Sequence, residues 1–434
     1  MKISKIHVEN FKSFNELTVP LSNYNVLIGE NAAGKSNFVN LLQFIRDIFN
    51  YGLDNAISMQ GGRDYIRNIN IGFQKELSLS IEIEPEKEDL SKQIIIPHIA
   101  KENLYGMIFE KYTYKFILHF LKTRIDYKII YELLLGEGKL YNVEIKSSGL
   151  KFTSFVDKIK IILEKNDKET FPLRAELSDK EKEKDVDIDL NYLTQRFPYV
   201  RITSQKPNTK KLLLEDVSIP SFASDIVTFF KQLSVYSIDP KLPKRSAIIT
   251  GKNELDFDGS NLSLVLKRIL EDKKTKSQFS LLVKDILPFV EDISIERYSD
   301  KSVIANLKET YSKKKYFPAS LLSDGTINII TILIILYFER KPFIIIEEPE
   351  RSMHPYLISK MINMINEVIG NKQILLTTHN PEIVKYTKLD NLYCIKRDAK
   401  GFSVINKASE MEFLSDFLEN DLGLDHLFIK NLIK

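Results

Sequence analysis

The segment from residue 24 to residue 51 constrains the fold of this chain more than any other. Its central loop, GENAAGKS, runs from Gly29 to Ser36 and matches the phosphate-binding pattern G-x-x-x-x-G-K-[ST] without a mismatch. The apolar stretch YNVLIGE leads into the loop, and SNFVNLLQFIRDIFNYG, with apolar residues at helical spacing, follows it. Because a phosphate loop needs a strand before it and a helix after it, this segment predicts an α/β core that binds phosphate.

The residue types in the loop suit contact with phosphate. Gly29 and Gly34 permit the backbone geometry that turns amide N–H groups toward an anion, and the start of the helix adds its positive end. Lys35 can reach the terminal phosphates, and the hydroxyl of Ser36 can ligate Mg²⁺. The predicted phosphate-binding residues are Gly29, Glu30, Asn31, Ala32, Ala33, Gly34, Lys35, Ser36 and Asn37.

A second apolar segment, PFIIIEE, ends in two adjacent carboxylates, Glu347 and Glu348. Each raises the other's cost of ionisation, so a purely structural role explains them poorly. Side chains alternate across a strand, and we therefore expect the two acids to point in different directions. Glu347 then stands where such a core holds Mg²⁺, and Glu348 can polarise a water in line with the γ-phosphate. In cores of this kind, the residue that holds Mg²⁺ at the end of this strand is usually an aspartate. Glu347 has a longer side chain, which can reach Mg²⁺ through a water molecule.

Two further stretches add candidate phosphate contacts. LLSDGT places Ser323 just before an apolar helix, where it forms either a second anion site or an ordinary helix cap. One chain rarely needs two γ-phosphate sites, whereas a head-to-tail dimer does. LLTTHN places His379 at the end of a strand, where it either contacts the γ-phosphate or has a structural role. We expect His354, in SMHP, to serve packing or subunit contact.

The hydrophobic patterns divide the chain into three predicted segments. Residues 1–150 form an N-terminal lobe with the phosphate loop and an antiparallel meander, predicted from ELSLSIEIE, YTYKFILHF, IDYKIIYELLL and LYNVEIK. Residues 151–300 form a mainly helical insertion, in which FVDKIKIILEKN, FASDIVTFFKQL, NLSLVLKRILED and FSLLVKDILPFV are predicted as amphipathic helices. Residues 301–434 form a C-terminal lobe in which PFIIIEE and QILLTTHN flank a helix, the pattern of a buried parallel sheet.

Composition excludes several classes of protein. With 43% hydrophobic and 28% charged residues, the 434-residue chain has the composition of a soluble globular protein. The apolar run INIITILIILYF is shorter than the roughly 20 residues that span a bilayer, so we expect a buried helix and no membrane contact. One cysteine, Cys394, excludes an internal disulfide, and the N-terminus lacks a signal peptide, which together predict a cytoplasmic location. The net charge of +3 implies no general field for polyanions, although basic runs at 240–245 and 312–315 leave nucleic-acid binding possible.

Taken together, these motifs resemble those of the stand-alone ABC-type ATPases of the AAA class that are related to the SMC, RecF and OLD proteins. The matching stretches, in order, are NFKSF, GENAAGKSN, DGSNLSLVL, LLSDGT, IIIEEPERSMHP and TTHNPEIV. They cover both ends of the chain and reach into its middle. The resemblance implies an α/β P-loop NTPase fold of the ABC and SMC-head type, with an antiparallel β-subdomain and a mainly helical insertion.

The resemblance also implies the ligands, ATP and Mg²⁺, and a role for each motif. Lys35 and Ser36 bind phosphate and Mg²⁺, Glu347 takes the Walker B metal role, and Glu348 is the catalytic base. His379 is the switch histidine. The signature, which acts in trans, is formed by Ser323, Asp324 and Gly325. Candidates for the Q-loop or adenine contact are Gln43, Gln60 and Gln74, and the sequence does not choose among them.

The function implied is an ATPase that forms a homodimer or a higher homo-oligomer, head to tail around two ATP–Mg sites. It would control a partner effector encoded nearby, in anti-phage defence. One alternative is a RecF- or SMC-like ATPase that binds DNA in repair or chromosome maintenance; another is a nucleotide-gated scaffold that does not hydrolyse ATP. Some relatives carry a C-terminal nuclease domain, but only 55 of the 434 residues follow His379, and we expect no nuclease domain in this chain.

Overall fold

A computed structural model describes residues 1–85, 94–97, 104–122, 126–146, 149–168, 174–178, 208–215, 221–312 and 314–411. The chain forms two compact units, each assembled from separate parts of the sequence. Unit 1 comprises Met1–Ser22, Ser36–Gln232 and Arg397–Val404, and unit 2 comprises Asn23–Lys35, Leu233–Lys396 and Ile405–Lys434. The phosphate loop up to Lys35 therefore belongs to unit 2, and the rest of the helix that follows it belongs to unit 1. The predicted segment boundaries at residues 150 and 300 stay a prediction.

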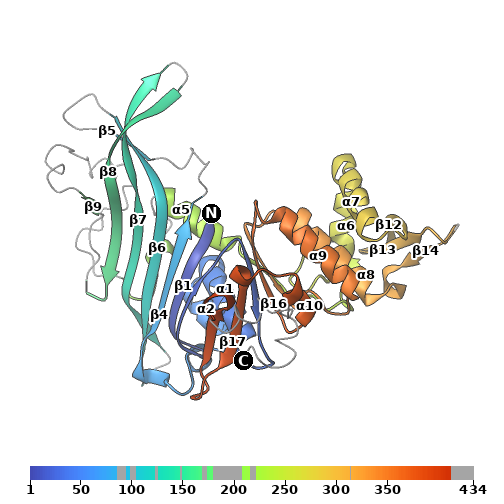
Figure 1. The fold of residues 1–434 in the computed structure, drawn as a ribbon, viewed down its shortest axis with the longest axis horizontal. Helices are drawn as coiled ribbons and strands as arrows, with labels where there is room; N and C mark the ends of the chain where they lie inside the picture. Colours follow the sequence, from blue (N-terminus) through green and yellow to red (C-terminus); the bar gives the residue numbers. More distant parts are fainter. Residues whose placement is uncertain are drawn as a thin grey trace. The chain divides into compact units, whose positions relative to one another are not determined.

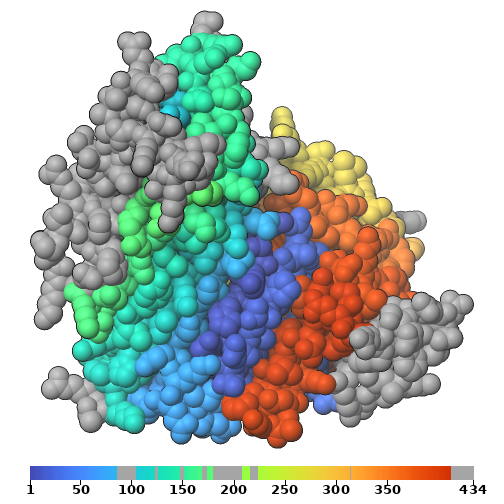
Figure 2. Space-filling model, turned by 60° about the vertical axis from the view of Figure 1, so that its left-hand side comes forward, coloured from blue at the N-terminus to red at the C-terminus, as the bar shows by residue number. Residues whose placement is uncertain are grey.

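Unit 1 is built on an eight-stranded antiparallel sheet (Figure 1). Its order is β2-β1-β4-β6-β7-β8-β9, and β5 pairs with β6. In Figure 2, the dark-blue N-terminal strands and the teal strands β6 and β7 lie on one face of this unit. The strands are β1 (Lys2–Phe11), β2 (Phe14–Pro20), β4 (Leu77–Glu84), β5 (Ile94–Pro97), β6 (Leu104–Phe120), β7 (Tyr127–Lys146), β8 (Gly149–Asn166) and β9 (Arg174–Leu177).

Among the described residues of unit 1, the longest helix is the one that follows the phosphate loop. That helix, α1, spans Lys35–Tyr51 and is predicted correctly from its sequence. Its apolar side chains, including Leu41, Phe44 and Ile48, are buried at helical spacing. The others are α2 (Leu53–Met59), α3 (Arg63–Ile66) and α5 (Ser221–Lys231), of which α5 confirms the helix predicted from FASDIVTFFKQL.

Two predictions for unit 1 are wrong. FVDKIKIILEKN, predicted as a helix, lies in β8, where Ile159, Ile161 and Leu163 are buried at every second position, the spacing of a strand. IDYKIIYELLL and LYNVEIK, predicted as two strands, share the single strand β7, which includes the first stretch from Tyr127 onward. The glycines between them do not form a turn. A Cβ at Gly138 would lie 2.3 Å from the carbonyl oxygen of Ile108, so β6 passes too close for any other residue type.

Unit 2 contains the parallel sheet that the sequence predicts, in the order β10-β15-β16-β3-β17-β18. Neighbouring strands from β10 to β17 are parallel, and nearly every residue of β3, β15 and β16 is buried. With the antiparallel sheet of unit 1, this core confirms the predicted mixed α/β fold class. The strands are β3 (Tyr24–Ile28), β10 (Ser234–Tyr236), β15 (Phe343–Glu347), β16 (Gln373–Thr378), β17 (Leu392–Arg397) and β18 (Ser403–Lys407).

The helix α8 (Asp324–Tyr337) lies in the hydrophobic core of unit 2. Every residue from Gly325 to Leu336 is buried, which confirms that INIITILIILYF is a core helix. The helix α9 (Pro355–Val368) packs beside it, and Figure 1 shows the two side by side. The short helix α10 (Pro381–Lys385) follows β16.

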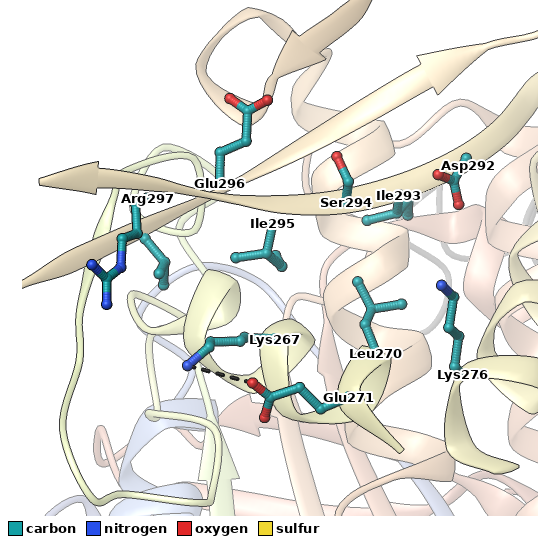
Figure 3. A pocket seen from close by; sticks show the side chains of 11 residues that line it. Lys267, Leu270, Glu271, Lys276, Asp292, Ile293, Ser294, Ile295, Glu296 and Arg297 are labelled. Carbon is teal, nitrogen blue, oxygen red and sulfur yellow. Dashed lines mark ion pairs between the residues drawn. The ribbon is translucent and has the colours of Figure 1, made fainter. Parts of the chain in front are cut away.

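A second, four-stranded sheet in unit 2 carries two helices on one face (Figure 1). Both helices, α6 (Leu262–Glu271) and α7 (Lys273–Ile286), are predicted from the sequence, but α7 begins six residues before the predicted stretch FSLLVKDILPFV and ends four residues before its end. A groove of about 340 Å³ opens between these helices and β12, with Leu270, Ile293 and Ile295 among its apolar lining residues (Figure 3). The strands are β11 (Ala247–Ile248), β12 (Val290–Ser299), β13 (Ser302–Glu309) and β14 (Tyr316–Pro318).

The cysteine of the chain, Cys394, lies in β17 with its side chain buried. Burial raises the pKa of its thiol to about 12, while Lys396 acts in the opposite direction. Among the helices that the structure describes, none has both the length and the apolar character needed to cross a bilayer.

Candidate nucleotide-binding site

Three sequence motifs meet at one edge of the parallel sheet of unit 2. The strands β3, β16 and β15 are neighbours, with Ile28 opposite Thr378 and Thr377 opposite Glu347. Because the carboxyl ends of parallel strands lie at the same edge, the loops that follow them are brought together. The residues at this edge are the phosphate loop after β3, Glu347 and Glu348 at the end of β15, and His379 after β16. The fold thus assembles residues that are far apart in the sequence.

The phosphate loop holds its lysine on its own backbone. Lys35 is 8% exposed, and its Nζ donates to the carbonyl oxygens of Gly29 at 2.7 Å and of Glu30 at 3.0 Å. Burial lowers the pKa of the Lys35 ammonium, and the charges of Glu348 and Glu350 act in the opposite direction. The lysine is therefore within the electrostatic field of both carboxylates, and its burial would strengthen its interaction with a phosphate.

The two glycines of the loop are needed for different reasons. Gly34 has a φ of +120°, which side-chain-bearing residues rarely adopt, as the prediction requires. Gly29 has an ordinary φ, but a Cβ there would lie 2.4 Å from the carbonyl oxygen of Ile395 in β17. Gly29 therefore allows close packing of two strands. Ala32, with a φ of +61°, supplies the other left-handed position of the loop.

The remaining loop residues differ in what their side chains can reach. Glu30, Asn31 and Ser36 are exposed, and Ser36 follows Lys35 directly in the chain. Asn37 donates from Nδ2 to Oγ of Ser13 at 2.8 Å within unit 1. The contribution of Asn37 to phosphate binding stays a prediction, because its amide is engaged in a contact between α1 and the turn after β1.

The turn after β15 places the two glutamates in a way that strand alternation does not predict. The strand ends at Glu347, and Glu348 has a φ of +46°, in the left-handed region. Its backbone N–H still donates to the carbonyl oxygen of Thr377 at 2.9 Å. The direction of the Glu348 side chain is thus set by the turn, and not by alternation along β15. Such a backbone conformation persists only where its surroundings hold it in place, which is common at functional sites.

Glu348 contacts two charged or titratable side chains. Its Oε1 lies 3.1 Å from Nδ1 of His379, a hydrogen bond that the imidazole donates when the carboxyl group is ionised. Its Oε2 accepts from Nη2 of Arg351 at 3.3 Å. The structure therefore brings together the predicted base and the predicted switch histidine.

Two residues beside the site, Glu350 and Thr378, are not among those predicted from the sequence motifs. Glu350 is 5% exposed and accepts a hydrogen bond from Oγ1 of Thr378 at 2.5 Å. Burial raises the pKa of Glu350, and this hydrogen bond acts in the opposite direction. The same hydroxyl accepts from the backbone N–H of Asn380 at 2.9 Å, so the bonds bracket His379 on both sides. The third carboxylate of EEPE is the sequence signal that could have indicated Glu350.

The predicted signature lies at the start of α8 in unit 2. Ser323 is the helix cap: its Oγ accepts from the backbone N–H of Thr326 at 3.1 Å. Asp324 forms an ion pair with Lys244, from the basic run at 240–245. A Cβ at Gly325 would lie 2.7 Å from the carbonyl oxygen of Ser352, so only glycine fits there. A cavity of about 370 Å³ opens at this helix start, and Ser323 and Thr326 are among the residues that line it.

Several other candidate residues have a structural place. The ring of His354 caps α9 by accepting from the backbone N–H of Tyr356 at 3.3 Å, in line with its expected packing role. Gln43 lies in α1, Gln60 ends α2 and Gln74 ends a 3-10 turn, and the choice among the three stays open. The groove between β12 and the two helices (Figure 3) contains none of the predicted site residues.

Among the described residues, one further group has the donor atoms of a metal site, namely His7, Glu9 and Glu16 on β1 and β2. The ammonium of Lys75 already lies 3.0 Å from Glu9 and 3.9 Å from Glu16. Burial raises the pKa of Glu9, but hydrogen bonds from Lys75 and His7 outweigh it and lower the pKa overall. A lysine thus already pairs with both carboxylates, and we assign the group a structural role.

The donor atoms at the nucleotide site suit Mg²⁺. Burial and the neighbouring Glu348 raise the pKa of Glu347, whereas a hydrogen bond from Ser237 acts in the opposite direction. A divalent cation beside Glu347 would favour its ionised form and remove the conflict between the two acids. Carboxylate oxygens are also ligands that Mg²⁺ accepts, and Glu347 supplies them.

The fold and these motifs define the class of the protein. The chain belongs to the family described as the AAA ATPase domain, which matches residues 1–384. Endonuclease GajA of Bacillus cereus (strain VD045) is 22% identical over 406 residues, covering 91% of this chain and 58% of GajA. Septu protein PtuA of Bacillus thuringiensis is 26% identical over 88 residues, covering 19% of this chain and 22% of PtuA. This chain therefore spans little more than half the length of the first of these relatives.

Two solved structures are also similar to this chain. An SMC head bound to the C-winged helix domain of ScpA has 12% identity and a TM-score of 0.47, covering 94% of this chain and 98% of its own. The SMC head domain from Thermotoga maritima has 13% identity and a TM-score of 0.42, with coverage of 94% and 99%.

Proposed function

We propose that this chain binds ATP with Mg²⁺ and hydrolyses it. The observation that carries the proposal is the assembly of Lys35, Glu348 and His379 at one edge of the sheet of unit 2. A phosphate loop alone would support nucleotide binding. A carboxylate that contacts a histidine at the same edge adds the groups that can orient a water and respond to the γ-phosphate.

Each side chain has a defined role in this proposal. Lys35 exchanges the carbonyl oxygens of its own loop for the β- and γ-phosphates. Ser36 and Glu347 would hold Mg²⁺, and the bound ion would supply electrostatic stabilisation of the phosphates. Glu348 orients the attacking water, and the contacts of its two oxygens with His379 and Arg351 limit the directions it can take. Loss of the γ-phosphate would change the contacts of His379 and, through this hydrogen bond, those of Glu348.

The proposal extends to a head-to-tail dimer that shares two ATP sites. Support comes from Ser323, which is exposed at the start of a buried helix and borders an open cavity. A helix start of this kind can accept the γ-phosphate of a second copy. The motif resemblance supports a further step, in which the ATP-bound dimer controls a partner effector in anti-phage defence. The relative named endonuclease GajA is longer than this chain. As part of this proposal, any nuclease activity belongs to a partner and not to this chain.

Phosphate release by the purified chain tests the central claim. We expect steady turnover with ATP and Mg²⁺, and none after Mg²⁺ is removed by chelation. Tight ATP binding without turnover would contradict hydrolysis and favour the nucleotide-gated scaffold. Salt-dependent binding of duplex DNA by the ATP-bound form would instead favour the alternative function in DNA repair or chromosome maintenance.

A further inference from the structure

The side chain of Asn328 donates two hydrogen bonds to the turn at residues 348–352, which carries the predicted base. We call these two bonds the clasp and this turn the clasped turn. Asn328 lies on the second turn of α8 and is 1% exposed. Its Nδ2 donates to the carbonyl oxygens of Pro349 at 2.9 Å and of Arg351 at 2.8 Å. The amide group has two N–H donors, and both are used on this one turn. Its Oδ1 is buried without a hydrogen-bond partner among the described residues, so the two donated bonds fix the amide's orientation.

The clasped turn has an unfavourable backbone conformation that contacts from its surroundings must stabilise. It is bounded by Glu348 and Ser352, whose φ angles of +46° and +62° are unusual for residues other than glycine. Gly325, one helical turn before Asn328, packs directly against the carbonyl oxygen of Ser352. Positions three apart lie on the same face of a helix, so the first two turns of α8 support both ends of the clasped segment.

We propose that Asn328 is a positioning residue that couples the start of α8 to Glu348. This inference rests on the proposed function, in which Ser323 receives the γ-phosphate of a second copy. Ser323 caps the helix on which Asn328 lies, and every residue from Gly325 to Leu336 is buried, so a small shift at the start of the helix would be carried to the clasp and from there to the base. Glu348 would then reach its working position only after a partner has closed on the helix.

Thr331 provides a matched control for this proposal. It is also buried and polar and lies three residues further along α8, but its hydroxyl donates to the carbonyl oxygen of Ile327 within the same helix, at 2.8 Å. Thr331→Val therefore removes a buried hydrogen bond without touching the turn. Asn328→Ala removes both bonds of the clasp, and Asn328→Ser keeps a polar group that cannot span the two carbonyls, should the alanine variant not fold.

The test compares ATP turnover, ATP affinity and hydrogen exchange in these variants. We expect the Asn328 variants to lose at least about tenfold in kcat while the Kd for ATP changes by less than about threefold, because positioning acts on the chemical step. Thr331→Val should keep kcat within about twofold of the wild type. An Asn328 variant with wild-type kcat, or a Thr331 variant with the same loss, would overturn the inference.

Hydrogen exchange separates this inference from the proposed function. The backbone N–H groups of Arg351 and Met353 donate within the turn, to Glu348 and Glu350. They should exchange faster in the Asn328 variants and at the wild-type rate in Thr331→Val. If the wild type releases no phosphate, the proposed function fails, while faster exchange still supports the clasp. Unchanged exchange would overturn the clasp whatever the activity.

Discussion

At the scale of single residues, Lys35 provides the most direct test of the nucleotide site. Its ammonium rests on two carbonyl oxygens of the loop and would be the one point charge that the loop brings to the phosphates. Removing a charged hydrogen-bond donor costs up to about 3 kcal/mol, so Lys35→Ala should weaken ATP binding about 100-fold. Calorimetric titration with ATP checks this. Lys400→Ala, at an exposed turn, is the control, and wild-type affinity in Lys35→Ala would remove the phosphate-loop assignment.

The two adjacent glutamates can be told apart by substitution with glutamine. Glu348→Gln removes the group that orients water but leaves Glu347, so ATP should stay bound and turnover should fall by at least about 100-fold. Size exclusion with ATP and Mg²⁺ should then show a stable dimer. Glu347→Gln should instead weaken Mg²⁺ binding, so that a higher Mg²⁺ concentration is needed for turnover. If Glu347→Gln forms the trapped dimer, the assigned roles are reversed.

Residues that belong to a motif with fixed spacing could be predicted from the sequence. Lys35, Glu348 and His379 each follow an apolar strand, and parallel strands bring such positions to one edge. Glu350 could not be assigned a role, because its partner Thr378 lies on another strand. Asn328 could not be assigned a role either, because its amide bonds to a turn that is more than 20 residues away in the sequence. A single sequence does not show which long-range contacts a buried polar side chain makes.

At the scale of elements, the end of α8 predicts a dependence of stability on pH. Lys372 donates from Nζ to the carbonyl oxygens of Leu336 at 2.6 Å and Glu339 at 2.5 Å. Burial lowers its pKa to about 8, while Glu339 acts in the opposite direction. Between this value and its ordinary pKa of roughly 10.4, the unfolded chain binds more protons than the folded one. The contribution of Lys372 to the free energy of unfolding should therefore increase as the pH rises through that interval.

Urea denaturation at several pH values between 7 and 10 measures this contribution. The stability of the wild type relative to Lys372→Met should increase with pH, since the variant lacks the titrating group. Relative to Lys400→Met, at an exposed position, the wild type should show no such trend. A wild-type advantage over Lys372→Met that stays constant or falls with pH contradicts the assigned pKa.

The elements predicted correctly are those with one clear periodicity. α1, α6 and α7 repeat at helical spacing, and β3 and β15 are short and apolar throughout. β8 was predicted wrongly because its segment KIKIIL fits both a helix and a strand. The pairing with β7 decides between the two structures. The glycines of β7 suggested a turn because glycine is common in turns. The close approach of β6, which requires glycine at position 138, depends on a contact between distant residues that the local sequence does not show.

At the scale of the whole molecule, mixing two inactive variants tests the head-to-tail dimer. Ser323→Arg should bind ATP like the wild type but fail to hydrolyse it, because a bulky cation would displace the opposing γ-phosphate. Lys35→Ala should be inactive for lack of bound ATP. In a mixed dimer, one site would combine an intact phosphate loop with an intact helix start. Random mixing gives half mixed dimers with one working site of two, so about a quarter of wild-type turnover should return.

Exchange of subunits has to be shown in the same experiment, for example with two differently tagged variants that co-purify. If mixed dimers form and remain inactive, the two sites are strictly coupled or Ser323 is only the helix cap seen at α8. A mixture of Ser323→Arg with Ser323→Arg/Lys35→Ala is the matched control, since no combination of these chains completes a site.

The buried position of Cys394 makes the wild-type chain a convenient background for spectroscopy. Thiol reagents attack the thiolate, and a thiol whose pKa lies near 12 in the interior of β17 should not react at neutral pH. A new cysteine in place of Leu321, which is 72% exposed beside the start of α8, would then be the single labelled position without any other substitution. Spin labels or fluorophores placed there would report distances between two copies directly as ATP is added and consumed.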